Sequence, residues 1–151
     1  MTMTDPRHAD LAARVGATLF AADRASKDLL QMHLAQCQPG RAVMRMTVRE
    51  EMLNGHRICH GGLIFTLADS TFAFACNSRN LATVAAGASI EFLRPAALGD
   101  VLTCEGVEQV LLGRHGIYDM TVTNQRGETV AVFRGKSAQV KGAVLPEVDV
   151  K

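Results

Sequence analysis

The chain has 151 residues and a formal net charge of +1, and charged residues make up 21% of it. This length supports one domain with its own hydrophobic core, and we expect a single domain over residues 1–151 with its core at about 20–140. A net charge near zero produces no broad basic surface, so we expect neither a nucleic-acid nor a membrane partner. The longest apolar run, over 63–77, contains Asp69 and is too short and too polar for a membrane span.

Cysteine usage indicates a reducing compartment. The four cysteines are widely separated and form no Cys-X-X-Cys pair, which is typical of free thiols: Cys37, Cys59, Cys76 and Cys104. The N-terminus carries Asp5, Arg7 and Asp10 before any apolar stretch, so it lacks the pattern of a secretory signal. We therefore expect a cytoplasmic protein.

The first third of the chain predicts one helix followed by two strands. Apolar residues recur at helical spacing over about 10–22 and predict an N-terminal helix. Polar residues at 23–28 break the chain, and strands are then expected over 29–37 and 42–49, on either side of a turn at Pro39-Gly40. A polar stretch with a second turn at Asn54-Gly55 leads to the next element.

The chain is organised around a second helix, expected over 63–77 and opened by Gly61 and Gly62. Its apolar residues lie on every side of the helical wheel, which predicts a helix buried all round. Asp69 is the single charge within it. Because an isolated carboxylate in a core costs several kcal/mol unless it is paired or protonated, Asp69 is a candidate functional residue.

The rest of the chain predicts strands joined by short turns, over 82–93, 100–111, 117–123 and 129–140, followed by a loose tail from residue 142. One buried helix between two early and four later strands predicts an α+β fold, with an antiparallel sheet wrapped around that helix. Such a sheet leaves edge strands open, and open edges favour pairing with another chain. We therefore expect an oligomer.

Several motifs follow one another in a recognisable order. Asn54 precedes His60-Gly61-Gly62, and Asp69 follows inside the apolar helix. Later come Ile90-Glu91-Phe92-Leu93-Arg94-Pro95 and Phe133-Arg134-Gly135-Lys136-Ser137. This combination resembles the hotdog-fold acyl-CoA thioesterases, and in particular the PaaI-type branch associated with phenylacetate breakdown. The resemblance covers about residues 20–140.

The resemblance implies a hotdog fold that forms homodimers with shared active sites, assembled further as dimers of dimers. It implies hydrolysis of an acyl-CoA thioester, with coenzyme A as part of the substrate and no other cofactor. By position, Asp69 matches the catalytic carboxylate and Gly61 the amide that polarises the thioester carbonyl, while Asn54 and His60 match residues that orient the acyl end or the attacking water. We place the following residues in the substrate and CoA-binding set: Gly62, Ala85, Gly87, Arg94, Arg134, Gly135 and Lys136. Ala85 falls where some members carry a water-holding Ser or Thr, so this chain departs from the pattern there.

The residues themselves support part of this assignment. A helix N-terminus presents unpaired N–H groups and a partial positive charge, and two glycines there leave room for a carbonyl oxygen. Asp69 lies eight residues beyond Gly61, which is about 12 Å along a helix, so one chain cannot easily apply both groups to one carbonyl. A two-fold dimer with neighbouring antiparallel helices would join Asp69 of one chain to Gly61 of the other. We therefore predict composite sites.

Structural explanations stand beside these functional ones. Asp69 could bridge helices, the two glycines could serve close packing, and His60 could orient a neighbour instead of carrying a proton. His56, Cys59 and His60 have no strong metal-ligand spacing, so we expect no metal, and Cys59 is more typical of a buried hydrophobe than of a nucleophile.

Three functions are consistent with this pattern. The favoured one is hydrolysis of phenylacetyl-CoA or hydroxyphenylacetyl-CoA, with Asp69 as base or nucleophile. The alternatives are a hotdog dehydratase or hydratase acting on acyl thioesters, and a non-catalytic acyl-CoA-binding module. An Asp inside the helix after His-Gly-Gly favours hydrolysis over dehydration.

Overall fold

The computed structural model describes residues 4–148. The helices are α1 (Pro6–Ala22) and α2 (Gly61–Asn77), with a π-helical turn η1 (Arg24–Leu29) and a 3-10 turn η2 (Glu50–Met52). The strands are β1 (His33–Gln38), β2 (Arg41–Thr47), β3 (Thr83–Phe92), β4 (Val101–Leu112), β5 (His115–Thr123) and β6 (Thr129–Gln139). Within the described residues, no helix is long and apolar enough to cross a membrane.

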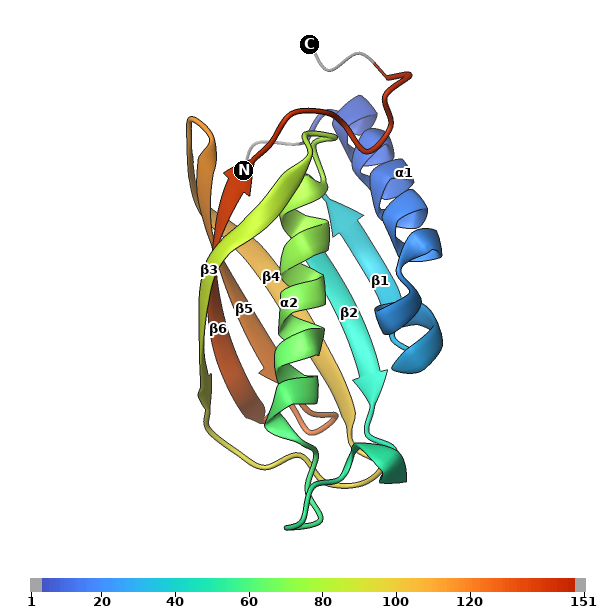
Figure 1. Ribbon diagram of the computed structural model, residues 1–151, viewed down its shortest axis with the longest axis vertical. Helices are drawn as coiled ribbons and strands as arrows, with labels where there is room; N and C mark the ends of the chain where they lie inside the picture. The colour runs from blue at the N-terminus through green and yellow to red at the C-terminus, as the bar shows by residue number, and fades with distance from the viewer. Residues whose placement is uncertain (1–3, 149–151) are drawn as a thin grey trace.

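The six strands form one antiparallel sheet in the order β1-β2-β4-β5-β6-β3. The chain crosses from β2 to the far edge through α2, which runs along one face of the curved sheet, while α1 covers the β1 end (Figure 1). The predicted α+β arrangement, with an antiparallel sheet around one helix, is confirmed. β3 lies at the opposite edge from β1, and its own outer side pairs with no described strand.

The core lies between α2 and the inward faces of β2, β4, β5 and β6. Aromatic rings meet at its centre, where the centroid of the Phe72 ring lies 5.5 Å from that of Tyr118 and 6.1 Å from that of Phe133. The Phe65 ring meets the Phe133 ring edge-on, with 5.2 Å between their centroids. Leu67 from α2 is fully buried against this cluster. These rings anchor α2 on the sheet and fix where its remaining side points.

The prediction that α2 is buried on all sides is wrong for the single chain. Gly62 and Ala73 are exposed, and Thr66 and Asp69 are half-buried. These residues are three or four positions apart, so they form one stripe along the helix, which we call the open stripe (Gly62, Thr66, Asp69, Ala73). The apolar residues on either side made the helix look buried throughout, although one side faces away from its own sheet.

The N-terminal region differs from the expected boundaries. α1 begins at Pro6, where the Asp5 side chain caps the helix by accepting a hydrogen bond from the Arg7 N–H at 2.9 Å. The expected polar break is the π-helical turn η1, capped by Asp23, so β1 begins only at His33. Buried Ser26 of η1 reaches Ser70 of α2, with 2.9 Å between the two hydroxyl oxygens. Polar residues that suggested a loop therefore form a cap and a buried contact.

The C-terminal segment is held in place as far as residue 148, so the prediction of a loose tail is wrong for 142–148. The Asn80 amide donates to the Leu145 carbonyl at 2.9 Å, and its oxygen accepts from the Leu145 N–H at 2.7 Å. The Ala82 N–H donates to the Gly142 carbonyl at 3.1 Å. Leu145 is buried, so this segment belongs to the folded unit.

Gly135 provides the sharpest test of the core packing. A Cβ at this position would lie 2.8 Å from the Phe72 ring, which is closer than two carbon atoms can approach. Gly135→Ala should therefore lower the free energy of unfolding by about 1–3 kcal/mol, measured by urea denaturation. Gly55→Ala is the control, because nothing lies within 4 Å of its added Cβ, and it should change stability by less than about 0.5 kcal/mol. Equal stabilities of the two variants would contradict this packing.

Candidate active site

The N-terminus of α2 presents a backbone donor with no partner. His60 is the N-cap, and its Nδ1 accepts a hydrogen bond from the Gly62 N–H at 3.1 Å. Hydrogen bonds from backbone N–H groups to backbone carbonyls begin at Leu63, whose N–H donates to the His60 carbonyl. The Gly61 N–H makes no hydrogen bond within residues 4–148. A free N–H at the positive end of a helix is suited to hold a carbonyl oxygen that becomes negatively charged.

Asn54 shapes the loop that leads to this helix. Its side-chain oxygen accepts hydrogen bonds from the His56 N–H at 2.9 Å and the Ile58 N–H at 3.4 Å, and its own N–H donates to the Ile58 carbonyl. The side-chain NH₂ group makes no hydrogen bond to any described residue. Asn54 therefore has a structural role through its oxygen and leaves two donors for a ligand.

A pocket of about 350 Å³ lies beside the N-terminus of α2 and brings three of the predicted site residues together. Asn54, Gly61 and Arg94 line it, and Arg94 is ion-paired with Glu128 at 3.0 Å. The remaining lining is mostly apolar and comes from the loop before α2, from α2 itself and from the segment after β3: Ile58, Cys59, Ile64, Phe92, Leu93, Pro95 and Ala96. An apolar hollow with a few converging polar groups is the usual form of a small-molecule site.

Phe92 is the residue that the sequence analysis did not place in the site. A Cβ built on Gly61 would lie 3.0 Å from the tip of the Phe92 ring, so the ring rests directly on this glycine. Packing against Phe92, as well as the proposed chemistry, therefore favours glycine at position 61. The available signal was an aromatic residue at the end of a strand, in the segment that carried the family resemblance.

Asp69 lies in the middle of α2, on the open stripe. It is half-buried and makes no hydrogen bond or ion pair with any described residue. Burial raises the pKa of its carboxyl group above the ordinary value of 3.8. It does not line the pocket at Gly61, from which it is separated by about 12 Å along the helix. One chain therefore does not bring the two groups together.

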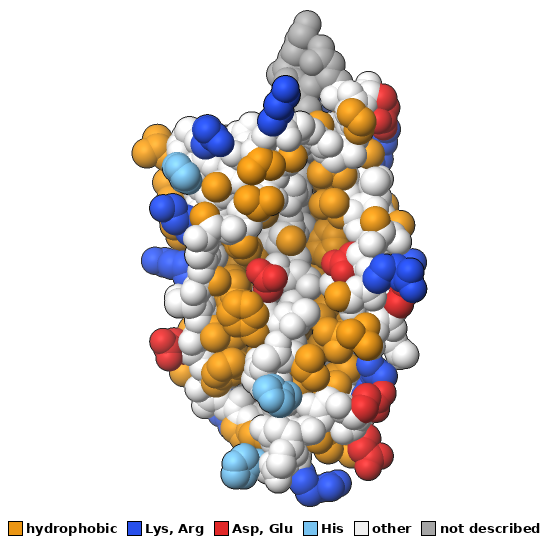
Figure 2. All heavy atoms as spheres, viewed as in Figure 1, with side chains coloured by type: hydrophobic (Ala, Val, Ile, Leu, Met, Phe, Trp, Pro, Cys, Tyr) orange, Lys and Arg blue, Asp and Glu red, His pale blue; other side chains and the backbone are white. Residues whose placement is uncertain are grey.

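The surface around Asp69 is apolar and lies next to an open strand edge. Seen from the α2 side, hydrophobic side chains gather along both sides of this helix (Figure 2). On or just after β3, Val84, Phe92 and Leu93 are 51%, 52% and 62% exposed. Ala85 and Gly87 lie on the same strand, at an irregularity in its pairing with β6, and are exposed. Ser89 of β3 pairs with Arg134, so its hydroxyl lies on the other face of the sheet and cannot take the place of the one missing at Ala85.

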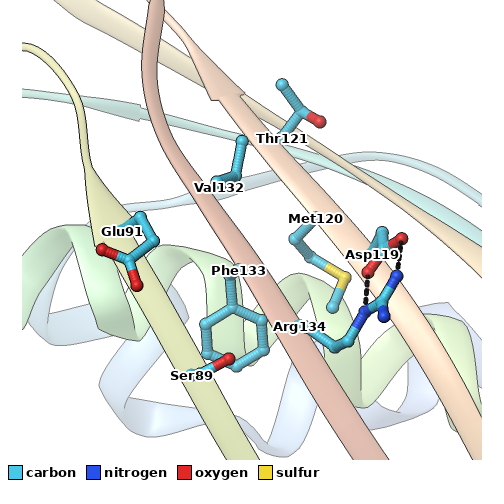
Figure 3. Close-up of a pocket in the computed structure, with 8 residues that line it drawn as sticks. All are labelled: Ser89, Glu91, Asp119, Met120, Thr121, Val132, Phe133 and Arg134. Atoms are coloured by element: carbon cyan, nitrogen blue, oxygen red, sulfur yellow. Dashed lines mark hydrogen bonds and ion pairs between the residues drawn. The ribbon is translucent and has the colours of Figure 1, made fainter.

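Arg134, Gly135 and Lys136 are not brought to this site within one chain. Side chains alternate along β6, so Arg134 and Lys136 are exposed on the face of the sheet opposite α2, while Gly135 is buried. Arg134 makes two hydrogen bonds to Asp119, at 2.7 and 2.8 Å, and these lower the pKa of that carboxyl (Figure 3). The close approach that Gly135 permits is made by the Phe72 ring and not by a ligand.

The thiol and metal alternatives gain no support. Burial raises the pKa of Cys59 to about 11, so its thiol stays protonated near neutral pH and is a poor nucleophile. Among residues 4–148, no three His, Cys, Asp or Glu side chains gather in a way that could hold a metal ion, and His56, Cys59 and His60 do not converge.

Comparison with known proteins identifies the family. A family model described as the thioesterase superfamily matches residues 56–131, which include α2 and most of the sheet. The chain belongs to the thioesterase superfamily. Its expected enzyme class, a hydrolase acting on thioester bonds, and its hotdog fold are confirmed at this level.

Individual relatives agree with this family. Acyl-coenzyme A thioesterase PaaI of Escherichia coli is 46% identical over 118 residues, which cover 78% of this chain and 84% of that protein. The solved structure of the E. coli PaaI protein from the phenylacetic acid degradation operon matches with a TM-score of 0.85 and 41% identity, over 89% of this chain and 97% of that one. A Streptococcus mutans protein solved with acetyl CoA bound matches with a TM-score of 0.72 and 27% identity, over 74% and 90% of the two chains.

The unpartnered carboxylate of Asp69 predicts a pH-dependent cost in stability. Well below pH 3.8 the carboxyl is neutral in both the folded and the unfolded chain, so Asp69→Asn and the wild type should be similarly stable. As the pH rises through the raised pKa, the folded wild type must ionise a desolvated group, so by pH 7 Asp69→Asn should be the more stable of the two.

Urea unfolding at pH 3 and pH 7 measures this difference, with Asp10→Asn on the exposed side of α1 as the control. The control should change stability by less than about 0.5 kcal/mol at either pH. If Asp69→Asn is less stable than the wild type at pH 7, the carboxylate is a structural bridge and not a group held ready for chemistry.

Proposed function

We propose that this chain is an acyl-CoA thioesterase that hydrolyses phenylacetyl-CoA or hydroxyphenylacetyl-CoA to the carboxylate and free coenzyme A. The observation that carries the proposal is that one helix presents two polar groups without hydrogen-bond partners among the described residues. They are the Gly61 N–H beside an apolar pocket and the half-buried Asp69 carboxylate. The arylacetyl substrate is supported by the E. coli PaaI relative and by the phenylacetic acid degradation operon named with its structure.

The chemistry follows from what these two groups can do. The Gly61 N–H donates a hydrogen bond to the carbonyl oxygen, on which negative charge develops, and one such donor is typically worth about 10²–10³ in rate. Asp69 acts on the other side of the carbonyl carbon, either by taking a proton from the attacking water or by attacking directly to form an anhydride that water then opens. In both routes the carbon–sulfur bond breaks, and coenzyme A leaves as the thiolate, which takes up a proton.

The distance between Gly61 and Asp69 requires a second chain. We propose that β3 pairs with β3 of a second copy in antiparallel fashion, since it is an open edge flanked by exposed apolar side chains. A two-fold axis at this edge sets the two α2 helices antiparallel, with the open stripe of each facing its partner. Asp69 of one chain then reaches the carbonyl bound at Gly61 of the other, which gives two sites per dimer. The family resemblance extends this proposal to a dimer of dimers.

The remaining polar groups have supporting roles in this proposal. The free NH₂ group of Asn54 holds the thioester or the attacking water, and His60 orients the helix N-terminus by capping it. Arg94 stands at the rim of the pocket, where it can exchange Glu128 for a phosphate of coenzyme A. Arg134 and Lys136 can meet a substrate only from a neighbouring chain, because they lie on the opposite face of the sheet. We propose no cofactor and a cytoplasmic location.

The position of Asp69 inside the helix that follows His60-Gly61-Gly62 favours hydrolysis over the dehydratase alternative. A dehydratase of this fold relies on a histidine that moves a proton at the acyl chain. The Nδ1 of His60 accepts the Gly62 N–H, so only Nε2 of this residue could take that role.

The direct test is release of coenzyme A thiol from a panel of phenylacetyl-, hydroxyphenylacetyl-, benzoyl-, hexanoyl- and palmitoyl-CoA. We expect the arylacetyl thioesters to have the highest kcat/KM, and Asp69→Asn to lower it by about 10² or more with little change in KM. Arg24→Gln is a matched surface control, since Arg24 is exposed, pairs with Asp28 within η1 and does not line the pocket, and it should leave the rate unchanged.

Either of two outcomes would overturn the proposal. If the folded wild type releases no thiol from any thioester, the chain is not a thioesterase, and dehydration assays should follow. If Asp69→Ala keeps the wild-type thioesterase rate, the carboxylate has no part in the chemistry, whereas a wild type that binds acyl-CoA without hydrolysing it would support the binding-module alternative.

A further inference from the structure

The ring of Phe92 occupies a position at the proposed site that has no assigned role. Phe92 ends β3, opposite Ala131 of β6, and its side chain lies on the α2 side of the sheet. The tip of the ring would lie 3.0 Å from a Cβ on Gly61, and its two neighbouring ring carbons 3.3 and 3.5 Å away. The edge of an aromatic ring therefore touches the residue whose N–H is the proposed oxyanion donor.

Phe92 is about half exposed and lines the pocket. It is 52% exposed, and together with Ile58, Ile64 and Pro95 it forms an apolar wall of the 350 Å³ hollow. The same hollow is also lined by the polar residues Asn54 and Arg94. A ligand carbonyl bound at the Gly61 N–H thus has its attached group within reach of the open part of the ring.

We infer that Phe92 is a specificity-determining residue that contacts the acyl group and selects aromatic acyl chains. This inference rests on the proposed function. In an arylacetyl thioester, one methylene separates the carbonyl carbon from the ring, so the substrate ring lies a few bonds from Gly61. It can then approach Phe92 at the centroid distance of about 4.5–7 Å at which aromatic pairs stack in offset or edge-to-face form. A flexible aliphatic chain gains no such directional contact.

The measurement is the ratio of kcat/KM for phenylacetyl-CoA to that for hexanoyl-CoA, determined within each enzyme preparation. Because both substrates are assayed on the same protein, the ratio does not depend on the fraction that is folded or assembled. Phe92→Leu should lower the ratio by about tenfold, since losing an aromatic contact while keeping apolar bulk is worth about one factor of ten. Phe92→Tyr keeps the ring and should retain the wild-type ratio within about twofold.

Leu98→Ala is the matched control. Leu98 is also 52% exposed, but it lies in the segment between β3 and β4 and does not line the pocket, so its ratio should equal that of the wild type. If Phe92→Leu and Phe92→Tyr both keep the wild-type ratio, or if Phe92→Leu slows both substrates equally, the inference is wrong. These outcomes differ from failure of the proposed function, in which the wild type itself releases no thiol.

Discussion

The rigid rise of α2 is the constraint on which the rest of the molecule depends. It carries a free backbone donor at Gly61 and a free carboxylate at Asp69, and it holds them about 12 Å apart along its axis. A helix anchored by buried aromatic rings cannot bend to close that distance. Two groups that each suit thioester hydrolysis are therefore useful together only when a second α2 lies antiparallel beside the first. The fold leaves room for this, because the open stripe and the β3 edge lie on the same side of the domain.

The same features are costly for an isolated chain. Asp69 is desolvated without a partner, and Phe92 and Leu93 leave apolar surface in water beside an unpaired strand. Natural proteins usually cover or charge such an edge. At the other end of the sheet, β1 is also an edge strand, but α1 packs against it. The contrast between the two edges supports the view that the β3 edge serves association and chemistry. Proteins usually keep locally unfavourable features, such as exposed apolar groups, at functional sites.

The sequence predicted the elements well wherever hydrophobic period and turn residues agreed. The strands β3 to β6 were expected to within two residues, because Pro95, Gly113 and Gly127 mark their ends. Polar residues were harder to interpret, since a local cap and a loop have the same composition. Asp23 and Ser26 therefore looked like a break although they form η1 and a buried contact to Ser70.

The candidate site was predictable where chemistry is local and not where it depends on packing. Gly61, Asn54 and Arg94, which the sequence analysis assigned to the site, line one pocket because the loop before α2 and the segment after β3 meet there. Strand alternation places Arg134 and Lys136 on the opposite face of the sheet, so their predicted contact with the substrate depends on a neighbouring chain. Phe92 was signalled only as an aromatic residue at the end of a strand, and the register of β3 against β6 was needed to show which face its ring takes.

The central claim, that each site joins Gly61 of one chain to Asp69 of its partner, can be measured with mixed dimers. Gly61→Pro removes the donor N–H at the first helical position, where the backbone accepts proline although the Phe92 ring, 3.0 Å from an added Cβ, must shift, and Asp69→Asn removes the carboxylate. Each variant alone should lose about 10² or more of its thioesterase rate. In dimers formed from one chain of each variant, the unaltered Gly61 of one meets the unaltered Asp69 of the other, so one of the two sites is intact and about half of the wild-type rate should return. Mixed dimers as inactive as either parent would show that both groups act within one chain, and the account given for this fold would be wrong.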